Sequence, residues 1–176
     1  MGFHSFLQKK SIPIESVMSK VWNNKIFKHI QTNVDLSSKK LAEERGSCPD
    51  AEEYGFKERF SNKTAIAPTA SISIICGGAS PGIEPVAANS YTHKTLSGSY
   101  NVRNRYLKKI LEKHGKDNAE TWSSITTNQG SVVHLHFLTD HEKEVFKTAF
   151  ELDQKWIVEL GADRTTYVSQ AQSINI

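Results

Sequence analysis

The chain has 176 residues, 22 of them basic and 19 acidic, with a formal net charge of +3. The two signs are interspersed, which excludes the basic stripe typical of nucleic-acid binding, and no apolar run reaches the ~18 residues of a membrane-spanning helix. Met1–Leu7 lacks the charged-then-apolar layout of a secretory signal. These features predict a cytoplasmic, globular chain forming a single domain.

The N-terminal quarter predicts helical structure. Apolar residues recur at about the 3.6-residue helical period after Ser11-Ile12-Pro13, from Ile14 to Val34. Asn23-Asn24 is a candidate interruption, and Gly46 is a candidate C-terminal cap. Residues 1–46 are therefore expected to form a helical part, and residues 47–61 a polar connector.

The next segment, residues 62–85, predicts a strand, a loop and a helix. Thr64–Ala67 reads as a short buried strand that Pro68 stops. Small and hydroxylated residues follow, where a helix could begin. A helix start offers unpaired N–H groups to an anion, and Thr69, Ser71 and Ser73 could add hydroxyl donors. On its own, this pattern more often marks an ordinary capped connection between a strand and a helix, with no ligand bound, than an anion site.

Downstream, the pattern predicts irregular structure with short extended parts over Ser80–Ser99 and a helix over Arg103–His114. Glu84 is expected to orient neighbouring groups rather than act as a general base. A further short helix is expected over Ala119–Thr127.

The last part, residues 139–176, predicts a helix and a strand. Thr139 and Glu142 form a capping box, and the apolar face after it predicts one helix ending at Gly161. Tyr167–Ile176 reads as a strand. Its separation from Thr64–Ala67 by helices suggests parallel pairing in an α/β layer.

Cysteine and histidine residues give no strong site. Cys76 lies in an apolar context and predicts a buried structural thiol, while Cys48 lies in a turn-like segment. The sequence leaves a Cys48–Cys76 redox pair open. His134 and His136 would share one face of an extended segment, but no third ligand of suitable spacing completes a metal site, so a solvated or hydrogen-bonded pair is expected.

Several motifs, in order along nearly the whole chain, resemble the C-terminal half of the large, catalytic subunit of class I ribonucleotide reductases. They are Met1–Leu7, Ala67-Pro68-Thr69-Ala70-Ser71, Gly82-Ile83-Glu84-Pro85, Tyr91-Thr92, Lys94–Gly98, Ala162-Asp163-Arg164 and Gln170–Asn175. This resemblance implies a portion of a ten-stranded α/β barrel. It also implies that the substrate's phosphates are bound by Pro68, Thr69, Ala70, Ser71 and Ile72, and that the substrate is a ribonucleoside diphosphate.

The departures from that family are equally specific. In that family the loop cysteine that carries the radical lies between an Asn and a Glu, and neither Cys48 nor Cys76 has these neighbours. The family also relays the radical through a Tyr-Tyr pair, and this sequence contains none. We therefore expect no catalytic residue, metal or cofactor in this chain, and no turnover by it alone. The resemblance implies the rest of the catalytic subunit and a radical-generating small subunit as partners. Two alternatives are a split-enzyme assembly piece and a non-catalytic nucleotide- or phosphate-binding module.

Overall fold

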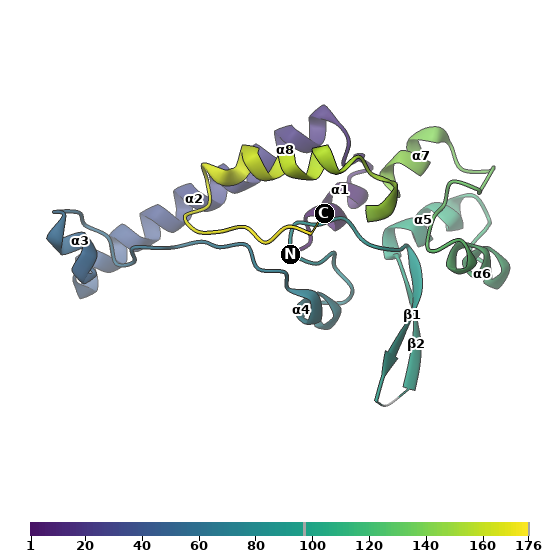
Figure 1. Cartoon of the computed structure of the whole chain (residues 1–176), viewed down its shortest axis with the longest axis horizontal. Coiled ribbons are helices and arrows are strands. Elements are labelled where there is room, and N and C mark those ends of the chain that lie inside the picture. Colours follow the sequence, from purple (N-terminus) through teal and green to yellow (C-terminus); the bar gives the residue numbers. More distant parts are fainter. Residues whose placement is uncertain (97, 176) are drawn as a thin grey trace.

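The computed structural model describes residues 1–96 and 98–175, which are mainly helical (Figure 1). Helices α2 and α8 lie together, α5, α6 and α7 gather at one end, and a hairpin projects from that end. In chain order the elements are α1 (Phe3–Lys9), α2 (Val17–Arg45), α3 (Pro49–Glu53), α4 (Ala70–Ile75), β1 (Ser90–Thr95), β2 (Gly98–Arg103), α5 (Arg105–Lys113), α6 (Ala119–Thr127), α7 (Asp140–Val145), a 3-10 turn (Ala149–Glu151) and α8 (Gln154–Thr165).

Helix α2 is longer and more regular than the sequence predicts. Ser16 caps its start, because the Ser16 Oγ accepts a hydrogen bond from the Ser19 N–H at 3.2 Å. The helix runs unbroken for 29 residues, so the interruption predicted at Asn23-Asn24 is wrong. Gly46, at φ +85°, closes the helix as expected. None of the described helices, α2 included, is both long and apolar enough to cross a membrane.

Helix α8 lies along α2 and buries the first of two apolar clusters (Figure 1). Polar contacts fix their relative position: Lys20 Nζ lies 2.5 Å from Glu159 Oε2, and Asn23 Nδ2 donates to the Leu160 carbonyl at 2.9 Å. The cluster also takes residues from α1 and from the segment after α4. Its buried members are Phe3, Leu7, Ile14, Ile83, Leu152, Ile157 and Leu160.

The single helix predicted from Thr139 to Gly161 is wrong, because two further caps divide the segment after the first. The capping box at Thr139 is confirmed: its N–H donates to Glu142 Oε2 at 2.9 Å, and its Oγ1 accepts from the Glu142 N–H at 3.2 Å. Thr148 and Glu151 form a second capping box. Asp153 then starts α8 by accepting from the Lys155 N–H at 3.0 Å. These side chains compete with the backbone for N–H groups and so favour new helix starts.

The second apolar cluster lies among α5, α6 and α7. The predicted helix over Ala119–Thr127 is confirmed with the same bounds, and Asn118 caps it by accepting from the Thr121 N–H at 2.9 Å. Asn104 caps α5. The buried members of this cluster are Leu107, Leu111, Trp122, Ile125, Val132, Leu135, Leu138, Val145 and Phe146.

The short extended parts expected within Ser80–Ser99 belong to a β-hairpin that continues to Arg103. Strands β1 and β2 pair antiparallel, from Ser90 opposite Arg103 to Thr95 opposite Gly98. Residues of β2 are exposed except for the half-buried Val102. Because the strand has no buried face, it lacks the alternation of apolar and polar residues by which strands are recognised.

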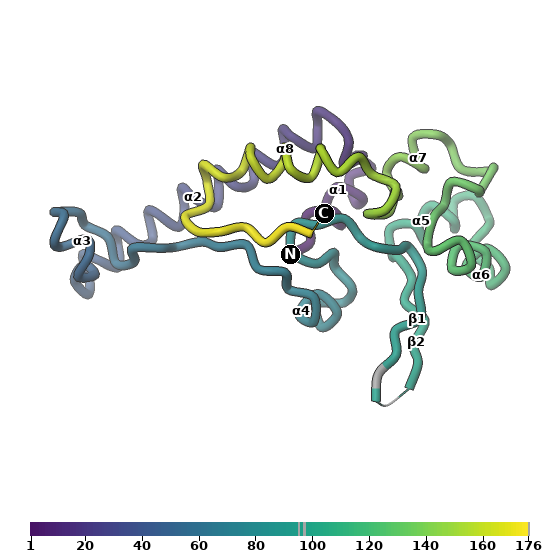
Figure 2. Tube along the Cα trace, in the orientation of Figure 1, coloured from purple at the N-terminus to yellow at the C-terminus, as the bar shows by residue number. Residues whose placement is uncertain are grey.

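The two predicted strands lie side by side but are shorter than expected. Figure 2 shows the yellow C-terminal segment running beside the teal segment that leads to α4. Their pairing is parallel, as predicted, with a bridge between Ile66 and Gln172, a 3.2 Å bond from Ile66 N to the Ala171 carbonyl and a 2.9 Å bond from Ser173 N to the Ile66 carbonyl. Ala65 and Ala67 are exposed, so the burial predicted for them is wrong, although Ile66 packs against the first apolar cluster. Among the described residues no further strand pairs with either segment. Ile176 of the predicted strand lies outside the described residues.

Candidate functional site

The loop between the first extended segment and α4 presents its backbone to solvent. Pro68 is exposed and is followed by Thr69, which adopts a left-handed conformation with φ +53° and ψ +30°. Helix α4 starts at Ala70. Because Thr69 turns the chain sharply, the first residues of α4 lie at the surface, where a ligand can approach them.

Three consecutive N–H groups at this start are available. Within the described residues no hydrogen bond occupies the N–H of Ala70, Ser71 or Ile72, whereas the N–H of Ser73 donates to the Thr69 carbonyl at 2.9 Å. All three residues are exposed. Unpaired N–H groups at a helix start carry partial positive charge and favour an anion.

The hydroxyl groups do not all serve as the sequence predicts. Ser73 is buried, and its Oγ donates to the Ala70 carbonyl at 2.6 Å, so it faces its own helix. Thr69 Oγ1 accepts a hydrogen bond from the Gly82 N–H at 2.8 Å. Ser71 is the hydroxyl of this group that remains exposed at the loop.

Comparison with known proteins covers the whole chain. The family described as "ribonucleotide reductase, barrel domain" matches residues 50–176. Over 180 residues, the chain is 47% identical to the ribonucleoside-diphosphate reductase large subunit of Invertebrate iridescent virus 6, with all of this chain and 19% of that protein covered. Over 194 residues it is 32% identical to the large subunit of Danio rerio, with 93% and 24% covered.

A solved structure gives the same result. The Actinobacillus ureae class Id ribonucleotide reductase alpha subunit matches with a TM-score of 0.91 and 40% identity, covering all of this chain and 32% of that one. The chain belongs to the ribonucleotide reductase family. The resemblance inferred from its motifs is thus confirmed, and so is the barrel fold class. The chain spans about a fifth to a third of the length of the relatives it matches.

In this reductase segment, Glu84 has the structural role expected of it. Its carboxylate accepts hydrogen bonds from the Asn175 backbone N–H and side-chain amide at 2.9 to 3.0 Å. The bonds join the segment after α4 to the C-terminal extended segment, so Glu84 orients neighbouring groups.

The two cysteines differ from each other in exposure. Cys76, at the end of α4, is exposed, so the predicted buried thiol is wrong. The reason is that α4 packs through Ser73, whereas its apolar residues Ile72, Ile74 and Ile75 face outward. Cys48 is half-buried at the start of α3.

The two histidines differ in exposure, His134 being half-buried and His136 exposed. His134 Nε2 lies 2.8 Å from Ser124 Oγ, and His136 is exposed, which agrees with the expectation of solvated or hydrogen-bonded histidines. Burial lowers the pKa of His134, and His136 and Lys143 lower it further through their charge. Among the described residues no group of three potential ligands is placed to hold a metal ion.

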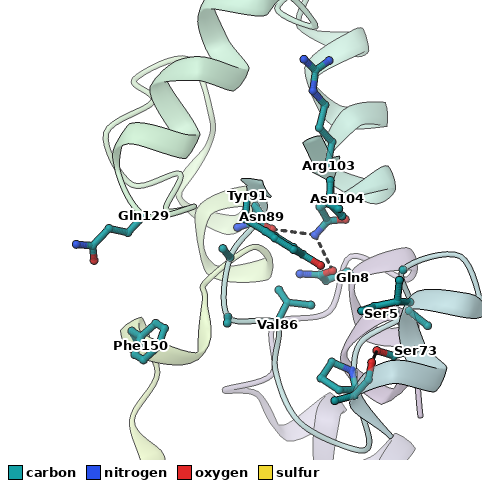
Figure 3. A pocket seen from close by; sticks show the side chains of 18 residues that line it. Ser5, Gln8, Ser73, Val86, Asn89, Tyr91, Arg103, Asn104, Gln129 and Phe150 are labelled. Atoms are coloured by element: carbon teal, nitrogen blue, oxygen red, sulfur yellow. Dashed lines mark hydrogen bonds between the residues drawn. The ribbon is translucent and has the colours of Figure 1, made fainter. Parts of the chain in front are cut away.

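A cavity of about 430 Å³ lies beside α4, and no pattern in the sequence indicates it (Figure 3). At one side of it Asn104 Nδ2 donates to Gln8 Oε1 at 3.0 Å and to Asn89 Oδ1 at 2.8 Å. The Asn104 Oδ1 is occupied by the Tyr106 N–H at 3.0 Å, which fixes the orientation of the amide. The three amides belong to segments far apart in sequence, so no local pattern predicts them, and they hold α1 against the start of α5.

Proposed function

We propose that this chain forms the substrate-phosphate-binding wall of a ribonucleoside-diphosphate reductase large subunit. The observation that carries the proposal is the row of exposed, unpaired N–H groups at Ala70, Ser71 and Ile72, within the motif that resembles the family's phosphate loop. Hydrogen bonds to a charged phosphate are roughly twice as strong as neutral ones. Three of them would anchor a diphosphate and leave the nucleoside to extend from the loop.

Pro68 and Thr69 have a different part in this proposal. Pro68 ends the extended segment, and Thr69, in its left-handed conformation, turns the backbone into the start of α4, where the three N–H groups lie. Binding of this kind holds the substrate equally in ground and transition states, so it positions the ribose and does not itself lower the chemical barrier.

We further propose that the chemistry takes place on residues outside this chain. Cys48 follows Gly-Ser and precedes Pro, and Cys76 follows Ile-Ile and precedes Gly-Gly, unlike the Asn-Cys-Glu context of the family's radical cysteine. In this proposal the rest of the large subunit supplies that cysteine, and a separate small subunit supplies the radical cofactor.

The loop can be tested in the chain itself, because this chain supplies the bonds from the Gly82 N–H to Thr69 Oγ1 and from the Ser73 N–H to the Thr69 carbonyl. Titration of the ¹⁵N-labelled chain with CDP or pyrophosphate should shift the amide resonances of residues 69–72, and cytidine, which has no phosphate, should not. Ser71→Pro removes one of the three N–H groups and should weaken CDP binding at least about tenfold. Equal affinity in that variant would contradict the phosphate-loop assignment.

A second candidate function, assembly with complementary polypeptide segments, rests on the open edges of the parallel pair. The segment around Ile66 and the segment around Gln172 pair only with each other among the described residues, and unpaired strand edges are templates for further strands. The mass of the chain in solution, alone and mixed with flanking segments of a related large subunit, tests this. A complex that reduces CDP supports assembly, and a monomer that ignores those segments contradicts it.

A further inference from the structure

Thr69 is held in an unusual backbone conformation by one long-range contact. Its φ of +53° lies in the left-handed region, which β-branched residues rarely adopt because of steric conflict at Cβ. The contact is the 2.8 Å hydrogen bond that Thr69 Oγ1 accepts from the Gly82 N–H. The β-branched side chain of Thr69 makes the left-handed conformation unfavourable, but its hydroxyl also forms the hydrogen bond that stabilises this conformation.

The partner position requires glycine. Gly82 has φ +48°, and a Cβ there would lie 3.2 Å from the Ala67 carbonyl oxygen and 3.3 Å from that of Pro68. Both of these atoms belong to the backbone that leads into the loop. The backbone of Gly82 thus reaches the loop only because it has no side chain.

The segment that delivers Gly82 is fixed on both sides of it. On one side the Ser80 N–H donates to Ser5 Oγ at 2.8 Å, and the Ser5 N–H donates to Ser80 Oγ at 3.2 Å. On the other side the Val86 N–H donates to Nδ1 of the fully buried His4 at 3.0 Å. We call residues 80–86 the brace. Helix α1 fixes the position of the brace through these hydrogen bonds, and the brace contacts the loop through the bond from the Gly82 N–H to Thr69 Oγ1.

We infer that Thr69 is a positioning residue for phosphate binding: its hydroxyl fastens the loop to the Gly82 N–H, and this contact aligns the N–H groups of Ala70, Ser71 and Ile72. The inference rests on the proposed function of that loop. It assigns the Thr69 side chain to the brace, whereas the anion is bound by the backbone beyond it.

The test is CDP affinity of the full chain, measured by NMR titration, in matched variants. Thr69→Val keeps the shape and the β-branch but loses the hydroxyl, and should weaken CDP binding about tenfold. Thr69→Ser restores the hydroxyl and should restore affinity. Thr32→Val, on α2, removes an exposed hydroxyl that donates to the Lys28 carbonyl of its own helix and should leave affinity unchanged.

A double-mutant cycle with Gly82→Ala separates fastening from direct contact with phosphate. If the two residues act through one contact, the double variant Thr69→Val/Gly82→Ala binds CDP no more weakly than the worse single variant. Losses that multiply would overturn the positioning role, as would unchanged affinity in Thr69→Val. Thermal unfolding of each variant, and amide resonances unchanged outside residues 66–86, show that the fold is intact.

The outcomes separate the two proposals. A wild-type chain that binds neither CDP nor pyrophosphate contradicts the proposed function, and the positioning role with it. Wild-type binding that is lost in Ser71→Pro but kept in Thr69→Val upholds the phosphate loop and contradicts only the positioning role of Thr69.

Discussion

Asn23 and Arg164 join the two long helices through one buried hydrogen bond, in which Arg164 Nε donates to Asn23 Oδ1 at 2.8 Å. The guanidinium lies between two aromatic rings, 5.4 Å from the ring centre of Phe3 and 5.3 Å from that of Phe27. Burial lowers the pKa of Arg164 to about 10. Among the described residues no carboxylate forms an ion pair with this guanidinium, although the charge of the neighbouring Asp163 partly offsets the effect of burial on its pKa. The buried cation therefore depends strongly on its neutral contacts.

Replacement of Asn23 should therefore be costly. Asn23→Leu leaves both the Leu160 carbonyl and the Arg164 guanidinium without their partner, and should lower the free energy of unfolding by about 3 kcal/mol. Asn24→Ala is the matched control, because within the described part of the chain the Asn24 side chain bonds only to the Lys20 carbonyl of its own helix, at 3.2 Å; it should change stability by less than about 0.5 kcal/mol. Urea unfolding measures both, and equal effects would contradict the role of Asn23.

Stability should fall in mild acid because of His4. Burial lowers the pKa of His4 to about 4, below its ordinary value of about 6.5. Between these values the unfolded chain binds the proton and the folded chain does not, so stability is full above about pH 6.5 and is lost as the pH falls toward 4. The loss should reach about 3 kcal/mol.

A variant that does not titrate isolates this effect. His4→Asn keeps an acceptor for the Val86 N–H but has no proton to gain. Urea unfolding between pH 4 and 7 should give a steeper decline for the wild type than for the variant. Parallel curves would show that His4 does not carry the pH dependence.

Gly130 is a position where a single methyl group should disrupt packing. A Cβ at Gly130 would lie 2.3 Å from the Ala88 Cβ and 2.8 Å from the Asn89 nitrogen, and φ is +82°. Gly130→Ala should cost about 3 kcal/mol or more. Gly115 has φ +65° with nothing within 4 Å, so Gly115→Ala should cost only about 1 kcal/mol, for the backbone alone. A Gly130→Ala chain as stable as Gly115→Ala would refute the predicted overlap.

Lys63 should stabilise the attachment to α2 of the segment that follows α3. Its ammonium lies 2.6 Å from Asp35 Oδ1 on α2 and 3.2 Å from Glu58 Oε2, with the side chain 15% exposed. Lys63→Met should lower stability by about 1 kcal/mol, and by less at high salt. Lys40, 77% exposed and 4.0 Å from Glu44, is the control, and Lys40→Met should have no measurable effect. Thermal unfolding measures both variants. Similar losses of stability in the two would contradict a stabilising role for the ion pairs of Lys63.

Local signals predicted helix ends better than helix continuity. The capping box at Thr139, the cap at Gly46 and the bounds Ala119–Thr127 were all predictable, because capping depends on residues within one turn of each other. The breaks at Thr148 and Asp153 were not predicted, because the apolar residues continue at helical spacing through them.

The other differences between the predicted and the observed structure come from contacts between residues far apart in the sequence. Asn23 reads as a weak helix residue in sequence, yet α8 supplies its partners, so the helix continues. The loop at Thr69 was predictable as a motif. Its attachment to Gly82 was not, since the two residues are 13 positions apart and meet only when the brace folds back.

The parallel pair has a consequence for the order of folding. The Thr64 N–H donates to Ser169 Oγ across 105 residues of sequence, and contacts of such long range form slowly, because closing a large loop costs chain entropy before any contact compensates for it. During synthesis on a ribosome, the segment before α4 must wait for residues near 170 to emerge. The extended segment that leads into the Thr69 loop therefore gains its partner only after the residues near 170 have been synthesised.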